Sequence, residues 1–88
     1  MKLENFTPRL MWEVEYFGVK ISIPADHKWV ATDEYGEVFS FPVKPEKKYR
    51  SWVVPQHYET KVALIGTFEP IEEYEVIKTL RHYPQEAA

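Results

Sequence analysis

Apolar and polar residues alternate near the start of the chain, and this alternation changes phase once. Apolar residues occupy the even positions of 12–16 and the odd positions of 19–23. An alternation of period two is typical of a strand with one buried face. A straight strand cannot change phase without turning its core face outward, so Gly18, between the two runs, is expected in a bulge or a tight turn. The pattern predicts two short strands that meet near Gly18.

Seven prolines divide the rest of the chain into short elements. The runs 29–33 and 37–41 flank a short loop closed by Gly36, which is the clearest hairpin signal in the chain. A short strand is predicted at 52–54. The run 61–68 is apolar on both faces, which is typical of a central strand in a sheet.

The segment 71–83 is the one helix that the sequence predicts. Its apolar residues fall near one face, its start is acidic and its end is basic, which suits the helix dipole. Pro70 fits the first position of a helix and Pro84 fits its end. Several residues of this segment also favour strands, so a last strand is the alternative.

We therefore expect a single domain over residues 1–88, because 88 residues build one modest hydrophobic core. The expected fold class is α+β, with a small antiparallel sheet of about four to six short strands and one C-terminal helix. A partly closed barrel, which would remove the strand edges, is the alternative. The expected core residues are Trp12, Val14, Ile21, Ile23, Trp29, Ala31, Phe39, Phe41, Val62, Leu64, Ile77 and Leu80.

Composition excludes several classes of site and protein. The chain has no cysteine, so it forms no disulfide and no thiolate metal site. Its net charge of −3 speaks against sequence-independent binding to duplex DNA, since proteins that do this are usually basic. No apolar run approaches the ~20 residues of a membrane span, and the first residues lack a secretory signal. We therefore expect a soluble protein of the cytoplasm with no membrane partner.

Residues that often carry catalysis or bind metals have no suitable neighbours in the sequence. His27, His57 and His82 have no second ligand at a helical metal spacing, so we expect three surface histidines and no metal or cofactor. The acidic pairs 33–34 and 72–73 are expected to serve a turn and a helix start. The sequence contains no glycine-rich phosphate loop and no nucleophile elbow. It therefore predicts a protein that is not an enzyme.

The most concentrated surface feature is a basic and aromatic segment. Its residues are Lys44, Lys47, Lys48, Tyr49, Arg50 and Trp52. They suit an acidic patch on a protein partner, because Tyr, Trp and Arg are common interface anchors, or single-stranded nucleic acid, through phosphate contacts and base stacking. The net negative charge of the chain favours the protein partner. A solvated loop whose Tyr49 and Trp52 turn into the core would have the same sequence pattern and is a further alternative. The acidic residues of 69–75 form a separate cluster that would suit local mimicry of nucleic-acid phosphates.

The segment 19–52 combines an alternating strand that ends in a proline, a strand that begins with a tryptophan, a turn glycine and a second tryptophan. The residues of this pattern are Val19, Ile21, Ile23, Pro24, Trp29, Ala31, Asp33, Gly36, Val38, Phe41, Pro45 and Trp52. The pattern resembles small uncharacterised accessory proteins of bacteriophages and prophages. Tyr74, Leu80 and Pro84 are similar to a degenerate form of their C-terminal pattern, in which a tryptophan takes the place of Tyr74.

The resemblance implies a non-catalytic protein that binds a host protein and inhibits or modulates it, as anti-defence and anti-CRISPR proteins do. It transfers no catalytic residue to this chain. Two other functions stay open on the sequence alone. One is a small β-barrel that binds single-stranded nucleic acid through residues 44–52. The other is a homodimeric structural module that pairs exposed strand edges.

Overall fold

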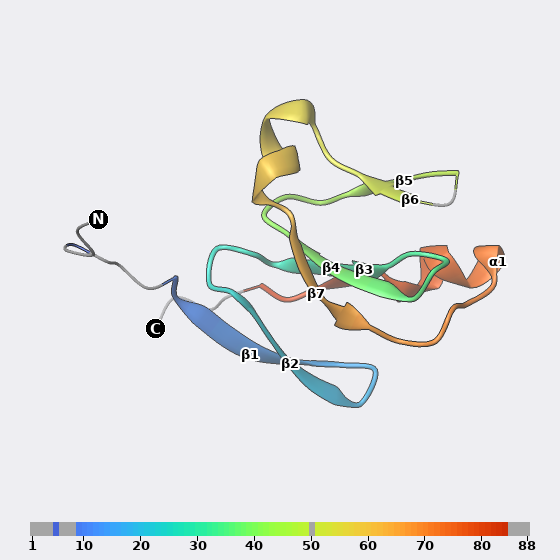
Figure 1. The fold of residues 1–88 in the computed structure, drawn as a ribbon, viewed down its shortest axis with the longest axis horizontal. Helices are drawn as coiled ribbons and strands as arrows, with labels where there is room; N and C mark the ends of the chain where they lie inside the picture. The colour runs from blue at the N-terminus through green and yellow to red at the C-terminus, as the bar shows by residue number, and fades with distance from the viewer. Residues whose placement is uncertain (1–4, 6–8, 50, 85–88) are drawn as a thin grey trace.

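The computed structural model describes Asn5 and residues 9–49 and 51–84. It consists mostly of antiparallel strands, with one short helix near the C-terminal end (Figure 1). The strands are β1 (Met11–Tyr16), β2 (Val19–Pro24), β3 (Trp29–Thr32), β4 (Glu37–Phe41), β5 (Glu46–Lys48), β6 (Ser51–Val53), β7 (Ala63–Thr67) and β8 (Arg81–His82). The helical segments are the 3-10 helix η1 (Gln56–Lys61), α1 (Glu73–Val76) and the 3-10 helix η2 (Ile77–Thr79).

A four-stranded sheet of order β7–β4–β3–β8 lies between two separate hairpins. Val30 pairs with Ser40 and Ala31 with Phe39, so these two pairs lie on opposite faces of the sheet. The β1–β2 hairpin covers the face of Val30, and the β5–β6 hairpin and η1 lie over the face of Phe39 (Figure 1). The described strands do not close into a barrel, so the barrel alternative is wrong.

The phase change near Gly18 corresponds to a tight turn between β1 and β2. Tyr16 pairs with Val19, so the even positions of β1 and the odd positions of β2 share one face. Phe17 and Gly18 form the turn, with φ values of 49° and 78°. Positive φ at both central residues gives a turn whose twist matches that of the adjoining strands. The prediction of a tight turn at Gly18 is confirmed.

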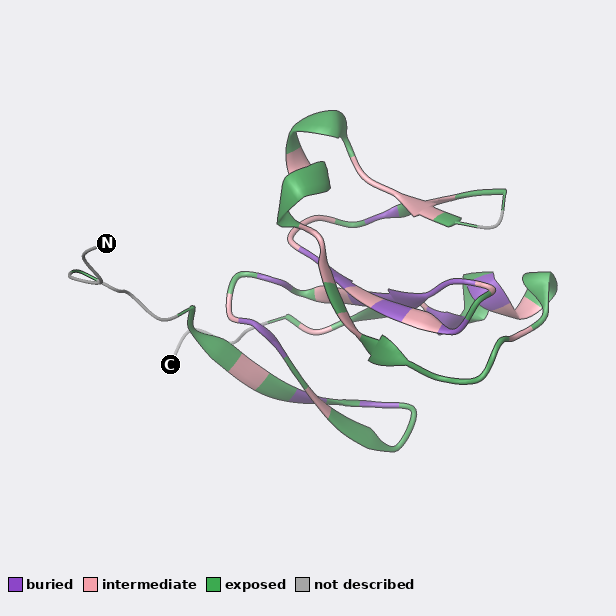
Figure 2. Ribbon diagram, in the orientation of Figure 1, coloured by how far each residue is buried: buried purple, intermediate pink, exposed green. Residues whose placement is uncertain are grey.

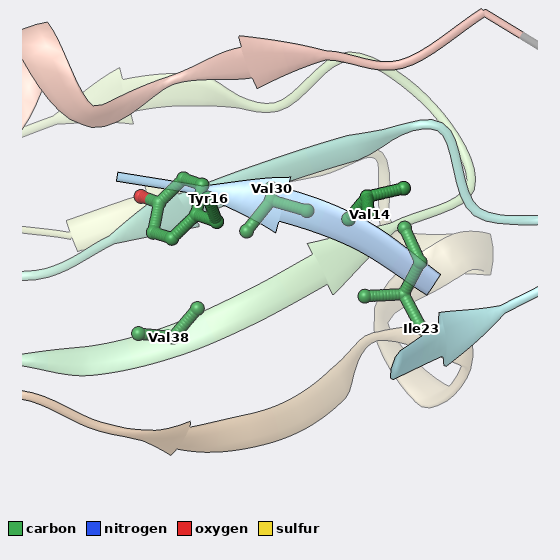
Figure 3. Close-up of a cluster of buried hydrophobic side chains, with 5 residues drawn as sticks. All are labelled: Val14, Tyr16, Ile23, Val30 and Val38. Carbon is green, nitrogen blue, oxygen red and sulfur yellow. The ribbon is translucent and has the colours of Figure 1, made fainter. Parts of the chain in front are cut away.

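The hydrophobic core lies between the β1–β2 hairpin and the central sheet (Figure 2). Its buried side chains, drawn in Figure 3, are Val14, Tyr16, Ile23, Val30 and Val38. Burying a large aliphatic or aromatic side chain contributes about 1.5–3 kcal/mol. These contacts therefore hold the hairpin on the sheet although no strand pairing joins the two among the described residues.

Most of the expected core is found at buried or half-buried positions. Val14, Ile23, Ala31 and Phe41 are buried, and six further residues are partly buried: Trp12, Ile21, Trp29, Phe39, Val62 and Leu80. Leu64 is 59% exposed, so its assignment to the core is wrong. The reason is that β7 is an end strand of the sheet and not a central one.

The segment 71–83 is not one helix. It consists of α1, η2 and β8, and β8 pairs with β3. The hydroxyl of Thr79 accepts the N–H of Thr32 at 2.9 Å and donates to the carbonyl of Val76 at 2.7 Å. These bonds fix the end of η2 on β3, and the extended backbone of Leu80 leads into β8. The interrupted helix leaves Ile77 exposed, so its assignment to the core is also wrong.

Candidate binding surface

The basic and aromatic segment of the sequence forms β5, β6 and the turn between them. Lys47 pairs with Trp52 across this hairpin, so the two side chains share a face. That face is turned toward the central sheet, because the indole N–H of Trp52 donates to the carbonyl of Thr32 at 3.0 Å. Trp52 is partly buried and attaches the hairpin to the sheet.

The end of this hairpin exposes two neighbouring residues of the segment, Lys48 and Tyr49. Tyr49 is 87% exposed and has a φ of 55°. The ammonium group of Lys47 donates to the carbonyl of Tyr49, which braces the turn. Lys48 is exposed next to it. Lys47, Lys48 and Tyr49 are called the hairpin tip below.

Two other residues of the segment are not part of the hairpin tip. Lys44 precedes β5, and its ammonium group lies 5.9 Å from the ring centroid of Trp29. Trp29 stacks on His82, with the ring centroids 4.0 Å apart, so Lys44 belongs to the surface at the start of β3. Arg50 lies outside the described residues.

A groove of about 580 Å³ lies between the hairpin tip and α1, and we call it the hairpin groove. Its lining residues are Lys47, Glu72, Glu73, Tyr74 and Ile77. Tyr74 is 66% exposed and Ile77 is 54% exposed. Across the part of the chain that the structure describes, the one ion pair joins Arg9 and Asp26, so Lys47 and the two glutamates have no ion-pair partner.

Negative charge dominates the α1 wall of the hairpin groove. The carboxylates of Glu75 and Glu72 raise the pKa of the Tyr74 hydroxyl above its usual value. The ammonium group of Lys78 lies 5.7 Å from the ring centroid of Tyr74. Tyr74 therefore presents a neutral phenol at pH 7, with a cation over its ring and acidic residues beside it.

A second groove, of about 380 Å³, lies between α1 and the turn of the β1–β2 hairpin. We call it the aromatic groove, and it is lined by Phe17, Thr32, Phe68, Ile71, Glu75, Lys78 and Thr79. Sequence reasoning missed this groove because the strands and loops that supply Phe17 and Phe68 are far apart in the chain. The available signal was a phenylalanine next to the turn glycine, where an apolar residue is unusual.

The acidic pairs have the structural roles that the sequence predicts. A side-chain oxygen of Asp33 accepts the N–H groups of Tyr35 and Glu37, each at 3.0 Å, and so stabilises the β3–β4 turn. Glu72 precedes α1 and Glu73 begins it.

His27 is buried, so the expectation of a surface histidine is wrong there, whereas His57 and His82 are exposed. A guanidinium only donates, so the Arg9 contact at 3.2 Å makes Nε2 of His27 the acceptor. Nδ1 then donates to the hydroxyl of Ser40 at 2.6 Å. Burial is the main cause that lowers the pKa of His27, and the positive charge of Arg9 also lowers it. The Ser40 hydroxyl is fully buried too, so this pair attaches the β2–β3 loop to β4 and has no route to a substrate.

Among Asn5, 9–49 and 51–84, no group of three His, Cys, Asp or Glu side chains is arranged to hold a metal ion. No helix within these residues is long and apolar enough to cross a membrane. No family model matches the chain, and no curated protein or solved structure matches it significantly.

Proposed function

We propose that this chain is a non-catalytic protein-binding module and that the hairpin tip is part of its contact surface. The observation that carries the proposal is the exposure of Tyr49, which directly follows two lysines in the chain. So exposed an aromatic side chain adds little to the stability of its own domain. Tyrosine beside cationic groups is, however, a common anchor in protein interfaces.

The hairpin groove supports the same proposal. Tyr74 and Ile77 provide exposed apolar surface there, and Lys47 and the glutamates of α1 surround it with charge. Protein interfaces usually combine an apolar centre with a polar rim. A partner that contacts the hairpin tip would therefore also find apolar surface to bury in the hairpin groove.

The resemblance to phage and prophage accessory proteins suggests the class of partner. We infer that the partner is a host protein whose activity the chain inhibits or modulates, as anti-defence proteins do. The proposal includes a cytoplasmic location for this protein. Inhibition by stoichiometric binding needs an exposed surface and no catalytic pocket, and the burial of Ser40 and His27 is consistent with this.

Affinity capture from a nuclease-treated bacterial lysate tests the proposal, followed by titration calorimetry with the captured protein. The variant Lys47→Glu/Lys48→Glu is expected to weaken binding by about tenfold or more, since hot-spot changes typically cost this much. The matched control is Lys20→Glu/Lys28→Glu, which makes the same charge change at two exposed lysines elsewhere. Equal affinity of the two double variants, or no captured protein, would contradict the proposal.

Single-stranded nucleic acid is the second candidate partner, because the hairpin tip combines cations with an aromatic ring. Trp52 is held against the central sheet, so the described tip has one exposed ring for base stacking. The barrel that this interpretation assumed is also absent from the described strands. Fluorescence anisotropy with a labelled oligonucleotide tests it. Binding that falls steeply with salt and is lost in the Lys47→Glu/Lys48→Glu variant would replace the protein-binding proposal.

A homodimer that pairs strand edges is the third candidate. β7 and β8 are the end strands of the central sheet and are the edges that such a dimer would use. Light scattering measures the mass in solution directly. The mass of one chain at high protein concentration would exclude this dimer.

A further inference from the structure

Few contacts attach the β5–β6 hairpin to the rest of the molecule. Among the described strands, β5 and β6 pair with each other and not with the central sheet. None of the described residues of these two strands is buried. The hydrogen bonds from the side chains of Lys47 and Ser51 end on carbonyls of the same hairpin. Segments that bury little apolar surface open locally at a low cost in free energy.

A single side-chain hydrogen bond joins the described residues of the hairpin to the central sheet. The indole N–H of Trp52 donates to the carbonyl of Thr32 at 3.0 Å. The hydroxyl of Thr79 also lies 3.1 Å from this carbonyl. The carbonyl therefore keeps a donor when the indole leaves, and the indole N–H can then bind water. Opening of the hairpin thus leaves neither group of this bond unpaired, and an unpaired buried group would be the larger cost.

The hairpin does not pack closely on the sheet beneath it. A cavity of about 330 Å³ separates the two, and it is lined by Phe39 and Phe41 on the sheet side and by Trp52 and Val53 on the hairpin side. Packed protein interiors have few voids larger than a water molecule. The hairpin can therefore leave the sheet without breaking a close-packed interface. The β1–β2 hairpin on the other face differs, because it covers the buried core.

Short irregular segments connect the hairpin to its neighbours along the chain. Residues 42–45 lead from β4 into β5, and residues 54–55 lead from β6 into η1. Pro45 is fully buried and so fixes the chain directly before β5. A few residues at the ends of elements are the usual positions of a hinge. The chain thus has a hinge position on each side of the hairpin.

We propose that the β5–β6 hairpin opens and closes on the central sheet as one unit while the core stays folded, and that Trp52 holds the closed state. The hairpin groove lies between the hairpin tip and α1, so it forms when the hairpin is closed. The opening itself is independent of the proposed function. Its consequence rests on that function, because closure of the hairpin then controls the affinity for the partner.

Hydrogen exchange followed by NMR on the 15N-labelled full chain tests the inference. Trp12 provides an internal control, because its indole N–H also donates to a carbonyl, that of His27 at 3.2 Å, and its ring packs against the core. We expect the indole N–H of Trp52 to exchange at least about tenfold faster than that of Trp12, since local opening precedes global unfolding. Equal exchange rates for the two indole groups would overturn the inference.

Trp52→Phe keeps an aromatic ring and removes the hydrogen-bond donor. We expect it to speed the exchange of the protected β5 and β6 amides by about three- to tenfold, which is the effect of one net hydrogen bond. The exchange of the β3 and β4 amides should stay unchanged, because the hairpin opens before the core unfolds. The matched control is Trp12→Phe, which should leave β5 and β6 exchange as in the parent.

Two outcomes of this comparison would refute the role of Trp52. One is a Trp52→Phe variant whose β5 and β6 amides exchange as in the parent. The other is an equal acceleration in β3 and β4, which would mean that the hairpin and the core open together.

Trp52→Ala removes the ring as well and should leave the hairpin open in much of the population. The apparent dissociation constant of a partner that needs the closed hairpin rises in inverse proportion to the closed fraction. We expect the host protein captured by the parent to bind this variant at least about threefold more weakly. Parent-like affinity in a variant whose hairpin amides show the open state would disprove the control of binding by closure.

The exchange measurements need no partner, so the two proposals can fail separately. If the indole N–H of Trp52 exchanges rapidly and no host protein is captured, the opening of the hairpin stands and the proposed function is wrong. If it exchanges as slowly as that of Trp12 while Lys47→Glu/Lys48→Glu weakens host-protein binding, the proposed function stands and this inference is wrong.

Discussion

A single buried histidine makes the stability of this small domain depend on pH. His27 accepts a hydrogen bond from Arg9 and donates one to Ser40, so its neutral form fits its surroundings. Burial and the charge of Arg9 lower its pKa in the folded state, and the nearby carboxylate of Asp26 opposes them in part. The protonated form would bring a second positive charge against Arg9, although a hydrogen bond to the backbone of Lys61 favours that form in part.

We expect the free energy of unfolding to be highest above the unfolded-state pKa of about 6.5 and to fall as the pH decreases below it. The sign follows because the unfolded chain binds a proton in this range that the folded chain does not. The slope for one proton is at most about 1.4 kcal/mol per pH unit. Urea unfolding of the parent and of His27→Gln between pH 7.5 and 5 measures it. The same slope in both proteins would contradict the prediction, and the exposed His82→Gln is the control.

Gly36 couples two elements that are distant in the chain. It closes the β3–β4 turn with a φ of 84°, and a Cβ atom there would lie 2.1 Å from the carbonyl oxygen of Phe68. The N–H of Phe68 also donates to the carbonyl of Gly36 at 2.7 Å. The turn therefore positions the loop that leads to α1 and supplies a wall of the aromatic groove.

Gly36→Ala is expected to lower the stability by more than the roughly 1–2 kcal/mol of left-handed backbone strain, because the clash with Phe68 adds to it. Gly66→Ala is the matched control, since its Cβ would meet nothing within 4 Å. It should be neutral within about 0.5 kcal/mol or slightly stabilising. Thermal unfolding compares the two variants. Similar melting temperatures for the two variants would contradict the prediction. They would show that the backbone of Phe68 moves to accommodate a Cβ atom at position 36.

The elements that local sequence patterns specify were predictable, and those that depend on distant contacts were not. The alternation of apolar and polar residues on either side of Gly18 predicted both strands and the turn between them. The segment 71–83 carried signals for helix and for strand, and its division is decided by Thr79, whose bonds to Thr32 no local pattern reveals. The apolar run 61–68 resembled a central strand, yet its position at the sheet edge depends on which other strands pair.

The candidate site divides in the same way. The hairpin tip could be predicted from the sequence, because its lysines and its tyrosine are adjacent in the chain. That the side chain of Trp52 faces the central sheet could not be predicted. The aromatic groove required Phe17 and Phe68 to approach from separate elements. Its components were visible in the sequence, but their proximity is a property of the fold.

At the scale of the whole molecule, stability depends on burial in both layers beside the central sheet. Phe41 is buried, Phe39 is half-buried and Leu64 is exposed. We expect Phe41→Ala to cost about 3–5 kcal/mol, Phe39→Ala less, and Leu64→Ala about 0.5 kcal/mol or less. Domains of this size have a stability of only about 5–15 kcal/mol, so Phe41→Ala should melt far below the parent. Equal urea midpoints for the three variants would disprove this ranking.

The start of β1 and the start of β3, which pairs with β8, lie at the end of the molecule away from α1 (Figure 1). Ala25 donates to the carbonyl of Leu10, and Tyr83 donates to that of Lys28, so both ends of the described chain are tied to the β2–β3 loop. Any further polypeptide, an affinity tag or a fused fluorescent protein would therefore leave from this side. Both grooves would stay accessible on a chain immobilised through either terminus, and the domain can be displayed on a sensor surface with its grooves directed into the solution.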